Sequence, residues 1–143
     1  MIKICYICMG NTCRSIMAER LIKKSLKDKK IQDVKVSSKG IRAKGDNIAE
    51  NAKLTLKKLH ASAGNRKSVK LGKIDKDTLY IVMSENMKSY VSTQKLITMK
   101  DLIGEDILDP YGGNEDVYMY VALKIMDANE KLIDKIKMWR NVW

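Results

Sequence analysis

Apolar and polar positions along the N-terminal part of the chain form blocks that predict a strand, a helix and a second strand. Residues 2–7 are an apolar run that is typical of a buried strand. After Ser15, apolar residues including Ala18, Leu21 and Ile22 recur at helical spacing with lysines between them, which predicts an amphipathic helix. Residues 34–37 alternate between apolar and polar, which indicates a second strand.

The same alternation of strands and helices continues to the C-terminus. Asp46 is a candidate N-cap for a helix that runs to about Leu59, and residues 79–83 form a short apolar strand. Ser84 is a candidate cap for a short helix with Glu85 in its first turn. Residues 96–99 predict a fourth strand. The longest helix is predicted over residues 117–138, which carry one continuous apolar face.

Strands that alternate with helices predict an α/β fold with a parallel sheet and helices on both faces. No Pro-, Gly- or Ser-rich linker divides the chain, so residues 1–143 are expected to form a single domain. Ligands of such sheets bind beyond the carboxyl ends of the strands. The stretch CMGNTCRS, residues 8–15, follows the first strand and leads into the first helix.

Net charge, apolar run lengths and the number of cysteines limit the partners and the cellular location that can be expected. The formal net charge is +11, which indicates either attraction to an anionic partner, such as nucleic acid or phosphorylated protein, or lysine as the ordinary surface residue. The second interpretation is favoured because the lysines are scattered rather than clustered. The chain has no zinc-finger spacing, RNA-binding aromatic signature or basic heptads, so no nucleic-acid partner is predicted. No apolar run is long enough to span a bilayer, and the N-terminus has no signal-peptide pattern. Three cysteines do not suggest a disulfide framework, so a cytoplasmic protein without a membrane partner is expected.

The stretch CMGNTCRS has the features of a loop that binds phosphate. Backbone N–H groups at a helix N-terminus have no intrahelical acceptor and attract anions. Gly10 and Asn11 tolerate the positive φ angles that curl a backbone around an oxyanion, and Arg14 supplies a planar fork for two phosphate oxygens. The nucleotide-binding pattern G-x-x-x-x-G-K-[ST] is absent, so a nucleotide loop is not predicted.

Cys8 is the candidate nucleophile of this loop. The loop amides and Arg14 favour the thiolate form of its sulfur, which attacks phosphorus readily. Ser15 is placed to donate its hydroxyl to the thiolate and to make the sulfur a better leaving group later. The alternative is that Cys8 is a small buried apolar residue.

The other two cysteines have different interpretations. Cys5 and Cys8 form a C-x-x-C pair, but a metal site needs more ligands and the only histidine is His60, so Cys5 is interpreted as a core residue. Cys13 belongs to the same loop as Cys8. It is either a packed loop residue or the partner of Cys8 in a reversible disulfide that protects the nucleophile from over-oxidation.

A second candidate motif is ILDPYGG, residues 107–113. Pro110, the only proline, restricts Asp109 to an extended conformation, and two glycines permit a tight turn. Asp109 would serve as general acid and then as general base, and Tyr111 would form a wall against the organic part of the substrate. Taken alone, the motif is more simply an ordinary turn with a capping aspartate.

Together, the N-terminal Cys8-to-Ser15 loop and the later Asp109-Pro-Tyr resemble the low-molecular-weight protein-tyrosine phosphatase family over nearly the whole chain, and Ser38-Lys-Gly resembles its Ser-Ala-Gly. The resemblance implies a flavodoxin-like three-layer sandwich around a four-stranded parallel sheet, with no metal and no organic cofactor. It implies that Cys8 is the nucleophile, that Arg14 binds the phosphoryl group and that Asp109 is the general acid. It also implies a phosphorylated protein as substrate, and inorganic phosphate or other oxyanions as ligands, held by Met9, Gly10, Asn11, Thr12, Cys13, Ser15 and Tyr111.

The resemblance leaves the phosphorylated residue open. The wider family implies phosphotyrosine, which we place first. GNTCRS, Gly-Gly after Tyr111 and the hydroxyl of Ser84 resemble the bacterial protein-arginine phosphatases, where threonine stands at the position of Thr12. An arsenate reductase would need later cysteines, and none follows Cys13. A non-catalytic phosphate-binding module would not need both Cys8 and Asp109.

Overall fold

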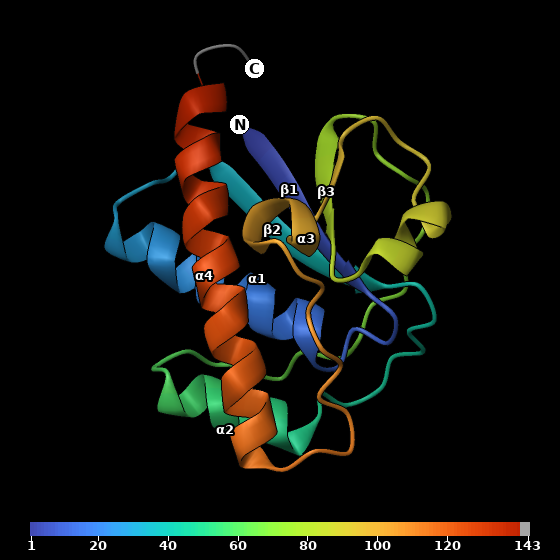
Figure 1. The fold of residues 1–143 in the computed structure, drawn as a ribbon, viewed down its shortest axis with the longest axis vertical. Coiled ribbons are helices and arrows are strands. Elements are labelled where there is room, and N and C mark those ends of the chain that lie inside the picture. The colour runs from blue at the N-terminus through green and yellow to red at the C-terminus, as the bar shows by residue number, and fades with distance from the viewer. Residues whose placement is uncertain (141–143) are drawn as a thin grey trace.

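A computed structural model describes residues 1–140 of the chain (Figure 1). Its centre is one four-stranded sheet in which every neighbouring pair is parallel and the strand order is β2-β1-β3-β4. The strands are β1 (Ile2–Cys8), β2 (Val34–Gly40), β3 (Thr78–Val82) and β4 (Leu96–Thr98). The sequence prediction of a single domain covered residues 1–143, and its last three residues, 141–143, lie outside the described residues.

The helices flank this sheet, which confirms the predicted α/β class. They are α1 (Arg14–Asp28), α2 (Glu50–Lys58), the 3-10 helix η1 (Glu85–Tyr90), α3 (Met99–Ile103) and α4 (Glu115–Trp139). Helix α1 packs on β1 and β2 and against α4, while α2 and α3 pack against α4 and η1 packs against β3 and β4. Figure 1 shows α4 as the long red-orange helix that crosses in front of α1.

Burial explains why the central strands form. All five residues of β3 are buried, and in β1 only Lys3 is not fully buried, as expected for strands covered on both faces. Strand β2 lies at an edge and alternates buried with more exposed residues. The register sets Cys8 opposite Gly40, so the ends of β1 and β2 lie side by side at the carboxyl edge of the sheet.

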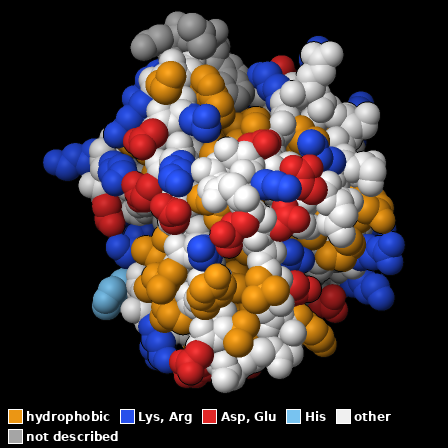
Figure 2. Space-filling view, viewed as in Figure 1, with side chains coloured by type: hydrophobic (Ala, Val, Ile, Leu, Met, Phe, Trp, Pro, Cys, Tyr) orange, Lys and Arg blue, Asp and Glu red, His pale blue; other side chains and the backbone are white. Residues whose placement is uncertain are grey.

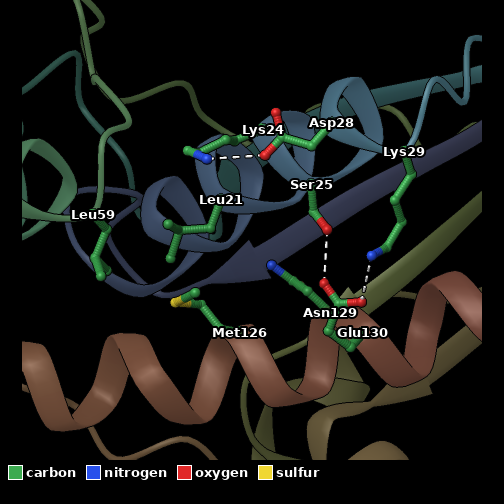
Figure 3. A pocket seen from close by; sticks show the side chains of 9 residues that line it. All are labelled: Leu21, Lys24, Ser25, Asp28, Lys29, Leu59, Met126, Asn129 and Glu130. Carbon is green, nitrogen blue, oxygen red and sulfur yellow. Dashed lines mark hydrogen bonds and ion pairs between the residues drawn. The ribbon is translucent and has the colours of Figure 1, made fainter.

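A buried polar contact fixes α4 to the sheet and to α1. The hydroxyl of Tyr6 donates to Asn129 Oδ1 over 2.6 Å, and Asn129 Nδ2 donates to the carbonyl of Ala18 over 3.3 Å. Beside this contact lies a pocket of about 270 Å³ between the C-terminal half of α1 and the middle of α4. Figure 3 shows the side chains that line it: Leu21, Lys24, Ser25, Asp28, Lys29, Leu59, Met126, Asn129 and Glu130.

The predicted helix start at Asp46 is wrong. Helix α2 begins at Glu50 with Ala49 as its N-cap, and Asp46 caps nothing. Instead, the backbone N–H of Asp46 donates to Ser68 Oγ, and its carbonyl accepts from Ser68 N, both over 2.8 Å. A tertiary contact therefore holds this residue in an extended connection that sequence propensity does not reveal.

Ser84 is the N-cap residue of η1 and Glu85 lies in its first turn, as predicted, but the Ser84 hydroxyl makes no capping hydrogen bond and donates instead to Asn86 Oδ1 over 2.5 Å. One further boundary differs from the sequence prediction. Strand β4 ends at Thr98 rather than at residue 99. Thr98 and Asp101 form a reciprocal capping box that starts α3. Within residues 1–140, no helix is both long and apolar enough to cross a membrane.

Candidate active site

The loop between β1 and α1 surrounds a small pocket at the carboxyl edge of the sheet. Strand β1 ends at Cys8, α1 begins at Arg14, and residues 9–13 connect them. The pocket has a volume of about 190 Å³ and is lined by Cys8, Met9, Gly10, Thr12, Cys13, Arg14, Asp109 and Tyr111. Eight of the ten predicted site residues therefore meet at one cavity. The other two, Asn11 and Ser15, are fully buried beneath it.

The sulfur of Cys8 receives two hydrogen-bond donors. The backbone N–H of Asn11 donates to Sγ over 3.2 Å, and Ser15 Oγ lies 2.8 Å from Sγ. Asn11 Nδ2 also donates to Ser15 Oγ over 2.7 Å, so the serine hydroxyl hydrogen is left to point at the sulfur. Both contacts stabilise a negatively charged sulfur, which is the reactive form of a cysteine.

Asn11 has a backbone conformation that the loop requires. Its φ is +55°, in the left-handed region that asparagine tolerates better than most residues. Gly10, for which the sequence suggested the same freedom, does not have a positive φ. The essential glycine is Gly40 at the end of β2, where a Cβ atom would lie 2.8 Å from the backbone nitrogen of Asn11.

A buried network holds Asn11 from below. Asn11 Nδ2 donates to Ser38 Oγ over 3.0 Å, and Ser38 Oγ donates to Glu19 Oε1 over 2.8 Å. Arg66 NH1 donates to the same carboxylate oxygen over 2.8 Å, and Arg66 NH2 donates to the Ser38 carbonyl over 2.8 Å. The side-chain amide of Asn11 is thereby held by residues from α1, β2 and the connection after α2.

Glu19 is ionised within this network. Burial alone would raise its pKa, but hydrogen bonds from Arg66 and Ser38, together with the charges of Arg66 and Lys23, outweigh burial and hold the pKa below its usual value. Sequence reasoning missed both Glu19 and Arg66. The available signal was an acidic residue on the buried face of a helix, four positions after Ser15.

The N-terminus of α1 is left open for an anion. Its N-cap, Cys13, makes no side-chain capping hydrogen bond, and its first turn carries no acidic residue. By contrast, α3 has a capping box and α4 has the Asn114 cap with two acidic residues in its first turn. The guanidinium of Arg14 is buried and donates from NH1 to the Ile107 carbonyl over 3.0 Å, which fixes it at the pocket. This arrangement suits an oxyanion.

Asp109 reaches the same pocket from the other side. Its Oδ2 lies 3.8 Å from Arg14 NH2, and its Oδ1 accepts the backbone N–H of Tyr111 over 3.1 Å. The Asp109 side chain is 59% exposed, so solvent protons reach it. Tyr111 is 80% exposed at the rim, where its ring is free to contact a substrate.

The three cysteines occupy distinct environments. Cys5 is buried inside β1 and does not line the pocket. Cys13 does line it, and its sulfur lies 3.2 Å from the hydroxyl of Tyr118, a residue that sequence reasoning did not single out. Burial raises the pKa of the Cys13 thiol, and hydrogen bonds from Tyr118 and Thr12 partly oppose that effect. All three cysteines are free thiols.

Comparison with known proteins agrees with this geometry. The family model described as low molecular weight phosphotyrosine protein phosphatase matches residues 3–141. The chain belongs to this family.

Two of the relatives carry different activities in their names. A protein-arginine-phosphatase of Geobacillus stearothermophilus is 33% identical, over 94% of this chain and 93% of the relative. The low-molecular-weight protein-tyrosine-phosphatase PtpA of Staphylococcus aureus is 32% identical, over 95% of this chain and 94% of the relative. A solved structure of a Bacillus subtilis YwlE mutant superposes with a TM-score of 0.87 at 28% identity, over 96% of this chain and 99% of that one. The chain therefore has the flavodoxin-like fold that the sequence predicted.

Proposed function

We propose that the chain hydrolyses phosphotyrosine in proteins through a cysteinyl-phosphate intermediate on Cys8. Support comes above all from one observation: the Cys8 sulfur, the Arg14 guanidinium and the Asp109 carboxyl line the same pocket, at the open N-terminus of α1. The membership of the chain in a phosphatase family adds to this support. The substrate would be a phosphorylated protein, and inorganic phosphate would occupy the loop as product.

Each residue has one role in the first step. The Cys8 thiolate attacks phosphorus, and a sulfur–phosphorus bond forms while the bond from phosphorus to the tyrosine oxygen breaks. The protonated carboxyl of Asp109 gives its proton to the departing oxygen. Arg14 and the N–H groups at the start of α1 stabilise the charge on the other phosphoryl oxygens.

The second step reverses the proton transfer. A water molecule gives a proton to the Asp109 carboxylate while its oxygen attacks phosphorus, and the sulfur–phosphorus bond breaks. Phosphate leaves, and the sulfur returns as a thiolate. The Ser15 hydroxyl, 2.8 Å from Sγ, and the Asn11 N–H, 3.2 Å from Sγ, stabilise that leaving thiolate.

Phosphoarginine is the second candidate substrate. The observation that favours it is the Thr12 side chain on the pocket wall, together with a protein-arginine-phosphatase among the relatives. A threonine hydroxyl presents a hydrogen-bonding group where an aliphatic residue would not, which suits a guanidinium more than a phenyl ring. The same Cys8, Arg14 and Asp109 chemistry would act on a phosphorus–nitrogen bond.

A paired turnover assay tests both candidates. It compares kcat/KM on a phosphotyrosine peptide and a phosphoarginine peptide of the same sequence, with Cys8→Ser as the blank. We expect Cys8→Ser to lose activity about 10³-fold or more. Near-wild-type activity in that variant would overturn the nucleophile assignment, whichever peptide is preferred.

The two substrates are then separated at Thr12. Thr12→Val keeps the branched shape and removes the hydroxyl, whereas Thr12→Ser keeps the hydroxyl as a matched control. If phosphoarginine is the substrate, Thr12→Val lowers its turnover relative to phosphotyrosine and Thr12→Ser does not. A ratio that neither variant changes would remove Thr12 as the determinant.

We also propose a cytoplasmic location. Free thiols at all three cysteines, one of them the nucleophile, are suited to a reducing compartment. Localisation of a tagged full-length chain by cell fractionation would test this directly.

A further inference from the structure

Charge is divided unevenly along the chain, although no run of lysines marks it. Residues 34–76 contain twelve Lys and Arg but only three Asp and Glu. Residues 77–143 contain eight Lys and Arg and eleven Asp and Glu. The excess positive charge of the protein therefore lies largely between the start of β2 and the start of β3.

The fold places part of this segment beside the phosphate loop. The backbone N–H of Arg42 donates to the Met9 carbonyl over 2.8 Å, and the N–H of Ala49 donates to the Thr12 carbonyl over 3.1 Å. The connection from residue 42 to 49 therefore runs along the phosphate loop, next to Met9 and Thr12, which line the pocket.

A second stretch of the segment lies against the first. The N–H of Gly40 donates to the Val69 carbonyl, and the N–H of Leu71 donates to the Gly40 carbonyl, both over 2.8 Å. The backbone at Lys70 thus forms an isolated parallel bridge with Gly40, at the end of β2. Farther along, Lys67 Nζ donates to Asn47 Oδ1 over 2.6 Å, so both stretches share one surface.

We call the exposed cations of this surface the basic rim; they are Arg42, Lys44, Lys67 and Lys70. Within residues 1–140, none of them forms an ion pair with an acidic group. One exposed acidic residue, Asp46, lies among them, which leaves the rim a net charge of +3.

The surface over α4 is different. Glu115, Asp127 and Glu130 each lie within ion-pair distance of a lysine. Figure 2 shows Lys and Arg interleaved with Asp and Glu over the upper part of α4 and hydrophobic side chains over its lower part, whereas basic side chains project from the right edge, at the height of the loop after β2. Unpaired charge beside a binding pocket attracts and orients a ligand of opposite charge.

We propose that the basic rim binds acidic residues that flank the phosphorylated residue of a protein substrate. This inference rests on the proposed phosphatase function and specifies its substrate class. Acidic flanks would lie over the stretch that includes Arg42, because the backbone of Arg42 contacts Met9 on the pocket wall, whereas Asp109 gives the pocket a negative charge of its own. The rim would thus select among phosphoproteins by charge, whichever phosphorylated residue enters the loop.

The test compares two phosphopeptides that differ only in their flanks, Glu and Asp in one and Gln and Asn in the other. Para-nitrophenyl phosphate, which has no flanks, measures the phosphatase chemistry separately. We expect the acidic peptide to have a kcat/KM about tenfold higher in 50 mM salt, and the preference to fall toward one at 1 M salt, where charges are screened within about 3 Å.

A variant with Arg42→Gln, Lys44→Gln and Lys70→Gln should lose most of this preference. The matched control removes the same charge elsewhere, by Lys131→Gln, Lys135→Gln and Lys137→Gln near the end of α4. Arg140, just beyond that helix, pairs with Asp33, whose carbonyl accepts the N–H of Ile2, so the end of α4 lies near the amino ends of the strands. The control variant should keep the preference.

The outcomes distinguish failure of the proposed phosphatase function from failure of the basic-rim proposal. No hydrolysis of para-nitrophenyl phosphate or of either peptide would overturn the proposed function itself. Hydrolysis with equal kcat/KM values on the two peptides would overturn the rim proposal alone, and so would an equal loss of preference in the rim and control variants. If an oligonucleotide bound the wild type but not the rim variant while the peptide preference stayed unchanged, the rim would be a nucleic-acid site and the proposal wrong.

Discussion

Helix α1 borders a pocket at each of its ends, and the two pockets differ in whether their charged groups pair with one another. The one at its C-terminal half is the larger, about 270 Å³ against about 190 Å³. There the charged groups satisfy one another: Ser25 donates to Glu130 over 2.7 Å, Lys29 lies 3.2 Å from Glu130, and Lys24 lies 2.9 Å from Asp28 (Figure 3).

The pocket at the N-terminus of α1 keeps its donors free for a ligand. The helix has no side-chain cap there, and the Arg14 guanidinium has a carboxylate oxygen only at 3.8 Å. The polar groups that are fully satisfied, those of Asn11 and Ser15, lie beneath the pocket and orient the Cys8 sulfur. Pocket size therefore does not identify the proposed active site of this molecule, whereas donors gathered around the proposed nucleophile, Cys8, do.

Arg14→Lys should produce the largest difference between the two ends of α1. Lysine keeps the charge but loses the planar fork, so we expect kcat/KM to fall by about 10³-fold. The matched control is Lys29→Gln, which breaks the pair with Glu130 at the other end and should leave kcat/KM within about twofold of wild type. Steady-state turnover of para-nitrophenyl phosphate measures both. Equal losses would mean that both ends of α1 act through helix stability alone.

Asp109→Asn should have the next largest effect, and one that depends on the leaving group. Without a proton donor, turnover of phenyl phosphate should fall by about 10²-fold. Para-nitrophenyl phosphate has a better leaving group, so its turnover should fall less. A plot of the logarithm of kcat/KM against leaving-group pKa should become steeper in the variant. An unchanged slope would exclude the general-acid role and leave Asp109 as a partner of Arg14.

Glu19→Gln should weaken the network beneath the pocket and destabilise the fold. The buried carboxylate pairs with Arg66, so its removal is expected to cost about 3 kcal/mol in the free energy of unfolding. The Glu19 pKa is lowered in the folded protein. Its contribution is therefore fully present above the ordinary value of 4.5 and is lost as pH falls through the lowered value.

Urea unfolding at pH 7 and pH 3.5 measures this contribution. The wild type should lose more stability between the two pH values than Glu19→Gln does. Glu130→Gln, in the pocket at the other end of α1, is the matched control and should cost less, because Glu130 is about half exposed. If the free energy of unfolding depended on pH in the same way in wild type and Glu19→Gln, the ion pair and hydrogen bonds of Glu19 would contribute nothing to stability.

The sequence predicted Cys8 and Arg14 from a local rule, because both belong to one strand–loop–helix unit at the carboxyl edge of the sheet. Asp109 lies in the loop after α3, and its catalytic role was predicted only through the family resemblance, since its own motif indicates no more than a turn. The network below was not predictable in this way. Glu19 and Arg66 are far apart in the sequence, and neither carries a local signal for the other. For the same reason the start of α2 was predicted wrongly, because the contact that removes Asp46 from a capping role comes from Ser68.

The basic rim illustrates a related limit of sequence reasoning. The scattered lysines were interpreted as ordinary surface residues because no run of them exists along the chain. Hydrogen bonds between residues 40 and 69, and between 42 and 9, bring two separate stretches to the same side of the pocket. Charge clustering is thus a property of the fold here, and only the pairing of strands and loops makes it visible.

Tyr118→Phe should have the smallest effect, a slower closure of a Cys8–Cys13 disulfide. It removes one hydrogen bond from the pocket at the N-terminus of α1. Peroxide would oxidise the Cys8 thiolate to a sulfenic acid and release hydroxide. The Cys13 thiolate would then attack that sulfur, form a disulfide and release a second hydroxide. Because the Tyr118 hydroxyl lies 3.2 Å from the Cys13 sulfur and lowers the pKa of that thiol, its loss should slow disulfide closure by about threefold.

The control is Tyr6→Phe, which removes the hydroxyl bonded to Asn129 beside the other pocket. It should reduce thermal stability without changing the rate of closure. Mass spectrometry of peroxide-treated protein at timed intervals distinguishes the disulfide from Cys8 sulfinic and sulfonic acids. Slower closure in Tyr118→Phe should be accompanied by more over-oxidised Cys8, because the sulfenic acid then waits longer for Cys13. Over-oxidation without any disulfide in the wild type would instead show that Cys13 is only a packed loop residue.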